Sequence, residues 1–161
     1  MKDRLTIVKV GGKIVEEPDT LAALLRDFAS IDGFKLLVHG GGRSATKVAA
    51  SLGVETQMID GRRVTDAEML RVVTMVYGGL VNKNIVAGLQ GLGVDALGMT
   101  GADMNIIRSD RRPVKTVDYG FVGDLDETSV AVQSIKNLID GGFVPVLCAI
   151  THDGETQLLN T

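Results

Sequence analysis

The chain has 161 residues, the length of one domain with a sizeable core. Its net charge is −3 and only 4% of its residues are aromatic, which argues against a nucleic-acid-binding surface. Its single cysteine, Cys148, excludes an internal disulfide and fits a reducing compartment. No apolar stretch approaches the roughly 20 residues of a membrane span, and the N-terminus is too polar for a signal peptide. We therefore expect a cytoplasmic protein without membrane or nucleic-acid partners.

The first part of the chain alternates strand and helix patterns. Residues 5–10 form a β-branched run closed by two glycines, which predicts a strand. A helix is expected from Pro18, ending at Asp32-Gly33. Its apolar residues recur at helical spacing: Leu21, Leu24, Leu25 and Phe28. Residues 35–39 predict a second strand and residues 43–52 a second helix. This alternation with short connections predicts parallel strands joined by helices.

A hairpin and a long helix are expected next. Residues 55–60 and 62–65 flank Gly61 and predict a small hairpin. Residues 65–68 match a capping box, in which a Thr hydroxyl and a Glu carboxylate satisfy backbone N–H groups at a helix start. Apolar residues then continue one helix face to about Leu92.

Two adjacent glycines, Gly78 and Gly79, fall inside this predicted helix. Each lowers local helix stability by about 1 kcal/mol relative to alanine. We therefore expect another backbone to pack closely there, and a symmetric dimer contact is one way to supply it.

The second half of the chain predicts one more β-α-β arrangement with a polar insertion. Residues 94–99 predict a strand. Shorter, more polar strands, expected to form an antiparallel annex, are at 105–108, 114–117 and 120–125. A helix is expected over 128–139, with inward residues Val132, Ile135, Leu138 and Ile139.

The last two strands are predicted at residues 144–150 and 157–160. The first is strongly apolar, and Cys148 within it is interpreted as a small core residue. Thr161 follows the last strand pattern directly, which favours a chain cut inside a larger protein over a complete fold.

Glycine bends follow the first two predicted strands. Lys9 precedes Gly11 and Gly12, and the carboxyl ends of parallel strands are where ligands of open α/β sheets bind. Glycines let a phosphate approach backbone N–H groups, and a lysine adds positive charge. The alternative is a solvated lysine before an ordinary tight turn.

His39 is followed by three glycines and a predicted helix, whose N-terminus attracts anions. The pattern is neither a Walker A loop nor the dinucleotide fingerprint, and a flexible turn is the alternative. We interpret His39 as structural. With two histidines and no cysteine pair, we expect no protein metal site.

Arg62 and Arg63 precede the long helix, and a guanidinium can hold a carboxylate through two parallel hydrogen bonds. Strand alternation sends the two side chains to opposite faces, so at most one should face a site. The alternative is a solvated hairpin tip. Together, the glycine bends, the lysine and one arginine predict an anion site for phosphate or carboxylate chemistry.

These motifs, in this order, resemble N-acetylglutamate kinases of the amino-acid kinase family. The segments that carry the resemblance are 9–12 (Lys-Val-Gly-Gly), 38–42 (Val-His-Gly-Gly-Gly), 61–65 (Gly-Arg-Arg-Val-Thr), 82–83 (Asn-Lys), 98–101 (Gly-Met-Thr-Gly), 120–123 (Gly-Phe-Val-Gly) and 159–160 (Leu-Asn). The resemblance spans essentially the whole chain. It implies an α/β fold, an open αβα sandwich with a mainly parallel sheet.

The resemblance also implies an activity. It is the ATP-dependent phosphorylation of the side-chain carboxylate of an N-acylated glutamate, the second step of arginine biosynthesis, by a homodimer. ATP would arrive with Mg²⁺ carried by the nucleotide. Residues 1–161 would form the N-terminal amino-acid-binding and dimerisation domain, with the nucleotide-binding lobe absent from this chain.

The resemblance implies roles for individual residues. Lys9 would stabilise the transferring phosphoryl group, and Gly11 and Gly12 would lie against the ATP phosphates. The amino-acid substrate would be bound by Gly41, Gly42, Arg63 and Asn160. The family usually has an apolar residue in place of Arg62, so the choice of arginine stays open.

Two alternatives remain at this point. The 161-residue chain holds half of the implied site and could be an inactive ligand-binding or dimerisation fragment. It could also belong to a kinase for another small acid on the same scaffold. The sequence does not identify the acyl group.

Overall fold

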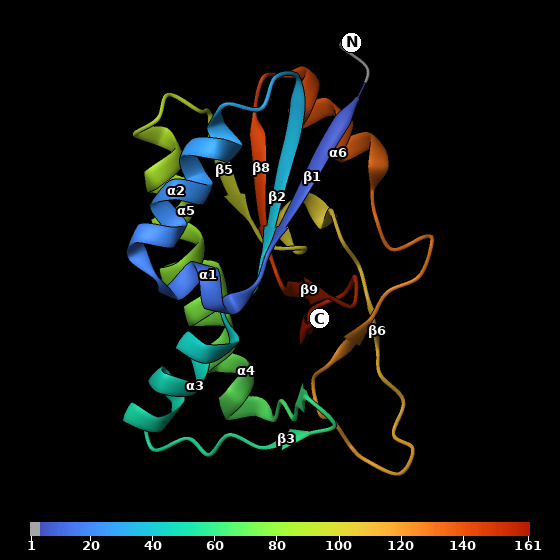
Figure 1. Ribbon diagram of the computed structural model, residues 1–161. Helices are drawn as coiled ribbons and strands as arrows, with labels where there is room; N and C mark the ends of the chain where they lie inside the picture. The colour runs from blue at the N-terminus through green and yellow to red at the C-terminus, as the bar shows by residue number, and fades with distance from the viewer. Residues whose placement is uncertain (1–3) are drawn as a thin grey trace.

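The computed structural model describes residues 4–161. Its centre is a parallel sheet of four strands in the order β1-β2-β8-β5 (Figure 1). The strands are β1 (Leu5–Val10), β2 (Phe34–His39), β8 (Val144–Cys148) and β5 (Ala96–Met99). The parallel sheet with helical connections confirms the predicted α/β class.

Helices cover both faces of the sheet, as Figure 1 shows. One face carries α1 (Gly12–Glu16), α2 (Pro18–Ala29) and α5 (Asn82–Gln90), and α6 (Val132–Asp140) lies on the other. Residues of β2 alternate between the two layers: Leu37 belongs to the larger core on the α2 side, and Leu36 to the smaller core on the α6 side. The short helix α1 was not predicted.

Below the carboxyl ends of the strands lie α3 (Gly42–Ser51), the hairpin of β3 (Met58–Ile59) and β4 (Arg62–Arg63), and α4 (Ala67–Val73). The hairpin is confirmed, although each strand pairs over two residues only. The predicted capping box is wrong. Asp66 caps the helix, and its carboxylate accepts a hydrogen bond from the Met69 N–H at 2.8 Å. Thr65 is occupied elsewhere, because its backbone pairs with Tyr119 and Phe121.

One helix runs without a break from Ala67 to Gln90, as α4, a π-helical segment η1 (Thr74–Val81) and α5. The π-helical segment was not predicted. By length and hydropathy alone this helix could cross a membrane. A core helix passes the same test, and Ile85 and Leu89 are fully buried against the rest of the fold.

The close backbone packing predicted at the two glycines is not found among residues 4–161. A Cβ added to Gly78 would meet only the Thr100 side chain, at 3.4 Å, and one added to Gly79 would meet nothing within 4 Å. The π-helical segment contains both glycines instead.

The remaining short elements are η2 (Asp103–Asn105), β6 (Asp110–Arg111), β7 (Gly123–Asp124), β9 (Ile150–His152) and β10 (Leu158–Asn160). The first three lie in the region of the predicted annex and match it in part. The predicted strand 144–150 is divided between β8 and β9, and β10 matches the predicted strand 157–160. Antiparallel pairs form between β6 and β7 and between β9 and β10, whereas residues 114–117 form no strand.

The last helix is shorter than predicted. It begins at Val132 because residues 126–129 form a turn, in which Asp126 accepts hydrogen bonds from Thr128. Val132 is therefore at the helix start and 70% exposed, so its predicted inward position is wrong. Cys148 is a buried core residue as predicted, and burial raises the pKa of its thiol to about 11.

Candidate functional site

The two glycine bends lie side by side at the carboxyl edge of the sheet. β1 and β2 are paired in register up to Val10 and His39, so both chains turn at the same level. A Cβ built on Gly12 would lie 3.7 Å from the backbone nitrogen of Gly42, and Gly11 faces open space. Lys9 is the second-last residue of β1, just before the bend, and its side chain is exposed. Both bends and Lys9 therefore meet at one edge, as parallel pairing predicts.

Arg63 links the hairpin to the second glycine bend. Its Nη2 donates hydrogen bonds to the carbonyl oxygen of Gly42 at 2.7 Å and to Oγ1 of Thr46 at 2.8 Å. Its Nη1 lies 3.4 Å from Oγ1 of Thr56. Arg62 is exposed on the neighbouring position, so the alternation of β4 places Arg63, and not Arg62, against the glycine bend.

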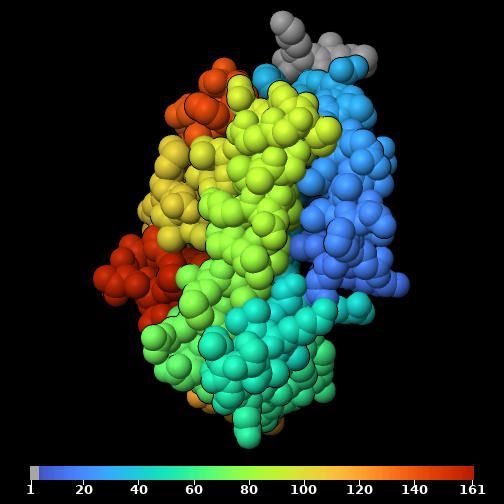
Figure 2. All heavy atoms as spheres, turned by 90° about the vertical axis from the view of Figure 1, so that its left-hand side faces the viewer, coloured from blue at the N-terminus to red at the C-terminus, as the bar shows by residue number. Residues whose placement is uncertain are grey.

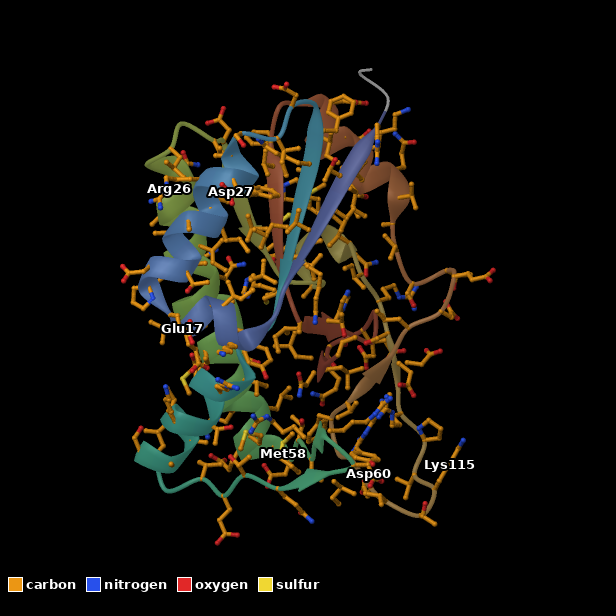
Figure 3. The ribbon with its side chains drawn as sticks, viewed as in Figure 1. Glu17, Arg26, Asp27, Met58, Asp60 and Lys115 are labelled. Carbon is orange, nitrogen blue, oxygen red and sulfur yellow. The ribbon has the colours of Figure 1, made fainter. Side chains whose placement is uncertain are left out.

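A pocket of about 290 Å³ opens beside Arg63. Three residues with predicted substrate roles line it: Gly42, Arg63 and Asn160. Arg62 and Arg112 line it as well, and no Asp or Glu side chain does among residues 4–161. Figure 3 shows the hairpin below the sheet, with Met58 near α4 and Asp60 toward the loop that carries Lys115. We call this cavity the arginine pocket. Its charge suits an anion.

Asn160 enters the arginine pocket from β10. Its Nδ2 donates a hydrogen bond to Oγ1 of Thr65 at 3.0 Å, and its backbone N–H donates to the carbonyl oxygen of Phe121. Thr65 is fully buried, so this contact fixes the amide next to Arg63. The same hydroxyl that fails to cap the helix therefore positions a predicted site residue.

Arg112 was missed because it lies on the polar annex, where the sequence offers no periodic pattern. Its guanidinium forms an ion pair with Asp124, which holds the pKa of that carboxyl below its usual range through the hydrogen bond. The charge of Arg112 is thus largely balanced, and Arg62 and Arg63 supply the positive field of the arginine pocket.

Tyr77 was also missed, because the pattern assigned its helix segment to the core. The side chain is 5% exposed and projects from the π-helical segment into the arginine pocket. A Cβ on Gly41 would lie 2.9 Å from Cδ1 of its ring, so only glycine fits beneath it. Burial raises the pKa of the Tyr77 hydroxyl, and the nearby Arg63 charge opposes this.

His39 has a structural role, as the sequence favoured. It is 1% exposed, and its Nδ1 lies 2.8 Å from the carbonyl oxygen of Gly40. Its Nε2 faces Nδ2 of Asn82 at 3.0 Å. A carbonyl accepts and an amide NH₂ donates, so the ring is the neutral Nδ1-H tautomer, and burial lowers its pKa. Within residues 4–161, no three His, Cys, Asp or Glu side chains gather as a metal site.

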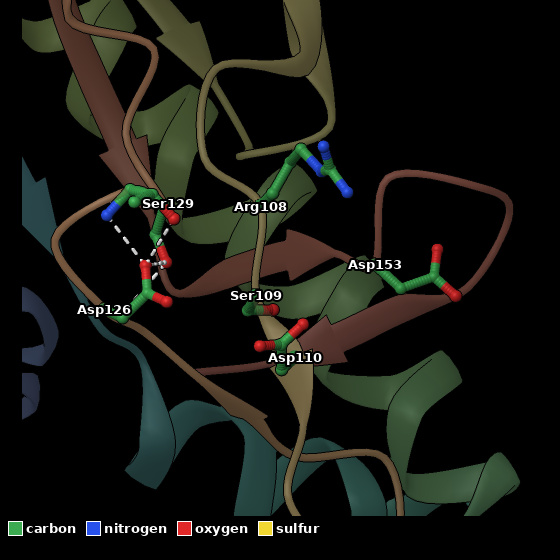
Figure 4. A pocket seen from close by; sticks show the side chains of 7 residues that line it. Arg108, Ser109, Asp110, Asp126, Ser129 and Asp153 are labelled. Carbon is green, nitrogen blue, oxygen red and sulfur yellow. Dashed lines mark hydrogen bonds between the residues drawn. The ribbon is translucent and has the colours of Figure 1, made fainter.

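A second polar pocket, of about 130 Å³, lies on the annex around Ser109 and Asp110 (Figure 4). Its Asp126 is already engaged by Thr128 and Ser129. It contains none of the predicted site residues and has less than half the volume of the arginine pocket. The arginine pocket and its glycine bends remain the candidate site.

Comparison with known proteins adds two findings on relatives. The chain is 65% identical to the acetylglutamate kinase of Bacteroides thetaiotaomicron over 161 residues, which is 100% of this chain and 62% of the relative. It is 37% identical to the acetylglutamate kinase of Methanopyrus kandleri over 97% of this chain and 62% of that protein. The chain thus spans about three fifths of the length of these relatives.

Solved structures share the fold. The smu.665 protein of Streptococcus mutans superposes with a TM-score of 0.80 at 24% identity, covering 99% of this chain and 64% of that one. An N-acetylglutamate synthase from Neisseria gonorrhoeae superposes with a TM-score of 0.77 at 19% identity, covering 97% and 36%. The sequence profile described as the amino acid kinase family matches residues 4–161. The chain belongs to the amino acid kinase family, as its motifs implied.

Proposed function

We propose that this chain is the N-terminal, amino-acid-binding and dimerisation part of an N-acetylglutamate kinase. Such an enzyme phosphorylates the side-chain carboxylate of an N-acylated glutamate. The observation that carries the proposal is the arginine pocket, which has no Asp or Glu side chain among its described lining residues and adjoins two glycine bends. The names of the relatives support the same substrate class.

Each part of the site has a place in this reaction. Arg63 and the Asn160 amide would hold the non-reacting carboxylate of the substrate, and Gly41 and Gly42 would present backbone N–H groups from the start of α3. The reacting carboxylate would then point toward the bend at Gly11 and Gly12. Fixing both anions in line is the main task in phosphoryl transfer.

ATP, with Mg²⁺ carried by the nucleotide, supplies the phosphoryl group. The first glycine bend fits phosphates, because Gly11 faces open space and no side chain covers the bend there. Lys9, exposed beside that bend, would neutralise charge that develops on the moving group. These residues give half of a kinase site. We therefore expect the 161-residue chain alone to be inactive.

The missing half would come from a nucleotide-binding lobe in the two fifths of the relatives that this chain does not span. The free edge of β1 supports this arrangement. In the part of the chain that the structure describes, β1 pairs on one side only, and Ile7 on it is 61% exposed. An apolar, unpaired edge is a docking surface that proteins normally cover.

A homodimer would form through the long helix. Figure 2 shows this helix running along one face of the molecule between α2 and the segment after β5. Met75 and Leu80 are 54% and 53% exposed there, and Gly79 lies between them with open space above it. A second copy packing on this face would provide the close backbone approach that the glycine pair suggested. We place the enzyme in the cytoplasm, at the second step of arginine biosynthesis.

The test is turnover by the full-length protein, meaning this chain together with the lobe proposed above. N-Acetyl-L-glutamate and ATP should give an acyl phosphate, trapped with hydroxylamine as the hydroxamate. Lys9→Ala should lower kcat by about 100-fold or more and leave the acylglutamate KM nearly unchanged, because one preorganised charge acts mainly in the transition state. Lys13→Ala, an exposed lysine on α1, is the matched control and should behave as the parent.

Two results would contradict the proposal. If the parent protein forms no hydroxamate, the proposed activity is wrong. If Lys9→Ala and the parent have equal kcat values, the proposed role of Lys9 is wrong. Faster turnover of N-acetyl-L-aspartate than of N-acetyl-L-glutamate would assign the site to another small acid.

A further inference from the structure

The side chain of Tyr77 is nearly buried and packs over Gly41. Its ring covers Gly41, where an added Cβ would lie 2.9 Å from Cδ1 and 3.3 Å from Cγ2 of Val81. The ring therefore fills the space that any side chain at Gly41 would need. It comes from the π-helical segment, a wide turn that is often found at functional sites.

The hydroxyl of Tyr77 lies beside the guanidinium of Arg63, the residue predicted to hold the substrate carboxylate. It is 3.8 Å from a Cβ built on Gly42, and so is Nη2 of Arg63. The hydroxyl and the guanidinium thus flank the same glycine at the start of α3. Both side chains line the arginine pocket together with Asn160.

Within residues 4–161, no protein group accepts the proton of the Tyr77 hydroxyl. None of the hydrogen bonds found in residues 4–161 takes it, and the neighbouring Arg63 side chain has only donors. The residue as a whole is 5% exposed, and it is one of the residues that line the arginine pocket. A hydroxyl that faces a pocket can donate to a ligand there, and a carboxylate oxygen is a strong acceptor.

We propose that Tyr77 is a substrate-binding residue, whose hydroxyl donates a hydrogen bond to the carboxylate that Arg63 binds. The carboxylate would receive a charged donor from Arg63 on β4 and a neutral donor from Tyr77 on η1. The inference rests on the proposed function for the identity of the acid. On this proposal, the π-helical segment of the long helix presents the Tyr77 hydroxyl to the arginine pocket.

The test compares Tyr77→Phe with the parent in the full-length protein. Phenylalanine keeps the ring against Gly41 and removes only the hydroxyl. The acylglutamate KM should rise about tenfold, the size expected for losing one hydrogen bond to a charged group, with kcat and the KM for ATP within about twofold. Tyr119→Phe is the matched control, because Tyr119 is the only other tyrosine of residues 1–161 and lies outside the arginine pocket. It should match the parent.

A spectroscopic readout separates binding from a structural effect. N-Acetyl-L-glutamate should produce a near-ultraviolet tyrosine difference spectrum in the parent and in Tyr119→Phe, and this signal should be absent from Tyr77→Phe. The melting temperature of each variant shows that it is folded. A Tyr77→Phe protein with the parent KM and the parent difference spectrum would overturn the inference and leave the proposed function standing.

Failure of the proposed function would give a different result. If the parent shows no turnover, the direct binding of N-acetyl-L-glutamate to parent and Tyr77→Phe decides the inference. Weaker binding by Tyr77→Phe supports it. Equal dissociation constants, or no binding to either protein, overturn it.

Discussion

Arg63 reaches from β4 to the start of α3 across the candidate site. One nitrogen of its guanidinium is shared between the Gly42 carbonyl and the Thr46 hydroxyl. Its Nη1 makes longer contacts, at 3.4 Å to Oγ1 of Thr56 and 3.8 Å to the sulfur of Met69, which a carboxylate would replace. Because the side chain is already oriented, little of its conformational entropy is left to lose on binding.

Arg63→Ala should therefore act mainly on substrate affinity. A hydrogen bond to a charged group is worth about 1.5–3 kcal/mol, so the acylglutamate KM in the full-length protein should rise about 10- to 100-fold. Steady-state kinetics with varied acylglutamate measures it. Arg63→Lys should restore little, because an ammonium does not reproduce the fork. Arg62→Ala is the comparison variant, because Arg62 is the exposed neighbour of Arg63. A larger rise in KM from Arg62→Ala than from Arg63→Ala would mean that Arg62 binds the carboxylate.

At the level of single elements, the start of the long helix shows that neighbouring residues of the predicted capping box have different roles. Asp66 caps the helix through the Met69 N–H, and Thr65 instead supports Asn160. Glu68, the other member of the predicted capping box, forms only an exposed ion pair with Arg71 at 3.3 Å.

Asp66→Ala should lower the free energy of unfolding by about 1 kcal/mol, the usual value of an N-cap. Glu68→Ala should change it by less than about 0.5 kcal/mol, because exposed pairs contribute little. Urea unfolding followed by circular dichroism measures both. Equal losses of unfolding free energy from Asp66→Ala and Glu68→Ala would mean that Glu68 also caps the helix, as the capping box predicts. Thr65→Ala should in addition raise the acylglutamate KM, since Asn160 would lose its fixed position.

The elements that local patterns determine could be predicted, and those that distant contacts determine could not. β1 and β2 are β-branched or apolar runs closed by glycines, and α2 has a regular stripe, so their positions follow from propensity and periodicity. The same reasoning predicted that Lys9 lies near the glycine bends, because the carboxyl ends of parallel strands meet at one edge of the sheet. Tyr77 needed the π-helical segment, whose sequence looks like that of an ordinary helix.

The annex is another part of the fold that local sequence patterns do not determine. β6 and β7 pair over two residues, and their position depends on Arg112 reaching Asp124 across the loop between them. No local pattern encodes such a contact. Asn160 could be named only through the family resemblance, and its partner Thr65 lies 95 positions earlier in the chain.

For the whole molecule, the most informative feature is where apolar surface is left exposed. On the outer edge, Ile7 of β1 is 61% exposed and Val132 of α6 is 70% exposed. A groove of about 520 Å³ runs between these elements, lined by Leu5, Phe34 and Ile139 among others. Soluble monomers seldom leave an apolar groove and an unpaired edge strand side by side. We therefore expect the proposed nucleotide lobe to cover this surface.

Ile7→Glu tests this arrangement in two proteins. In the 161-residue chain the side chain is largely in water, so the free energy of unfolding should change by less than about 0.5 kcal/mol. In the full-length protein the lobe would bury it, and an uncompensated carboxylate there should cost about 2 kcal/mol or more. Val114→Glu is the matched control, since Val114 is 63% exposed on the loop after β6 and should be tolerated in both. Denaturant titration of the four variants gives the comparison. An Ile7→Glu substitution that is equally harmless in the full-length protein would mean that the lobe docks elsewhere, and the edge of β1 would then need another partner.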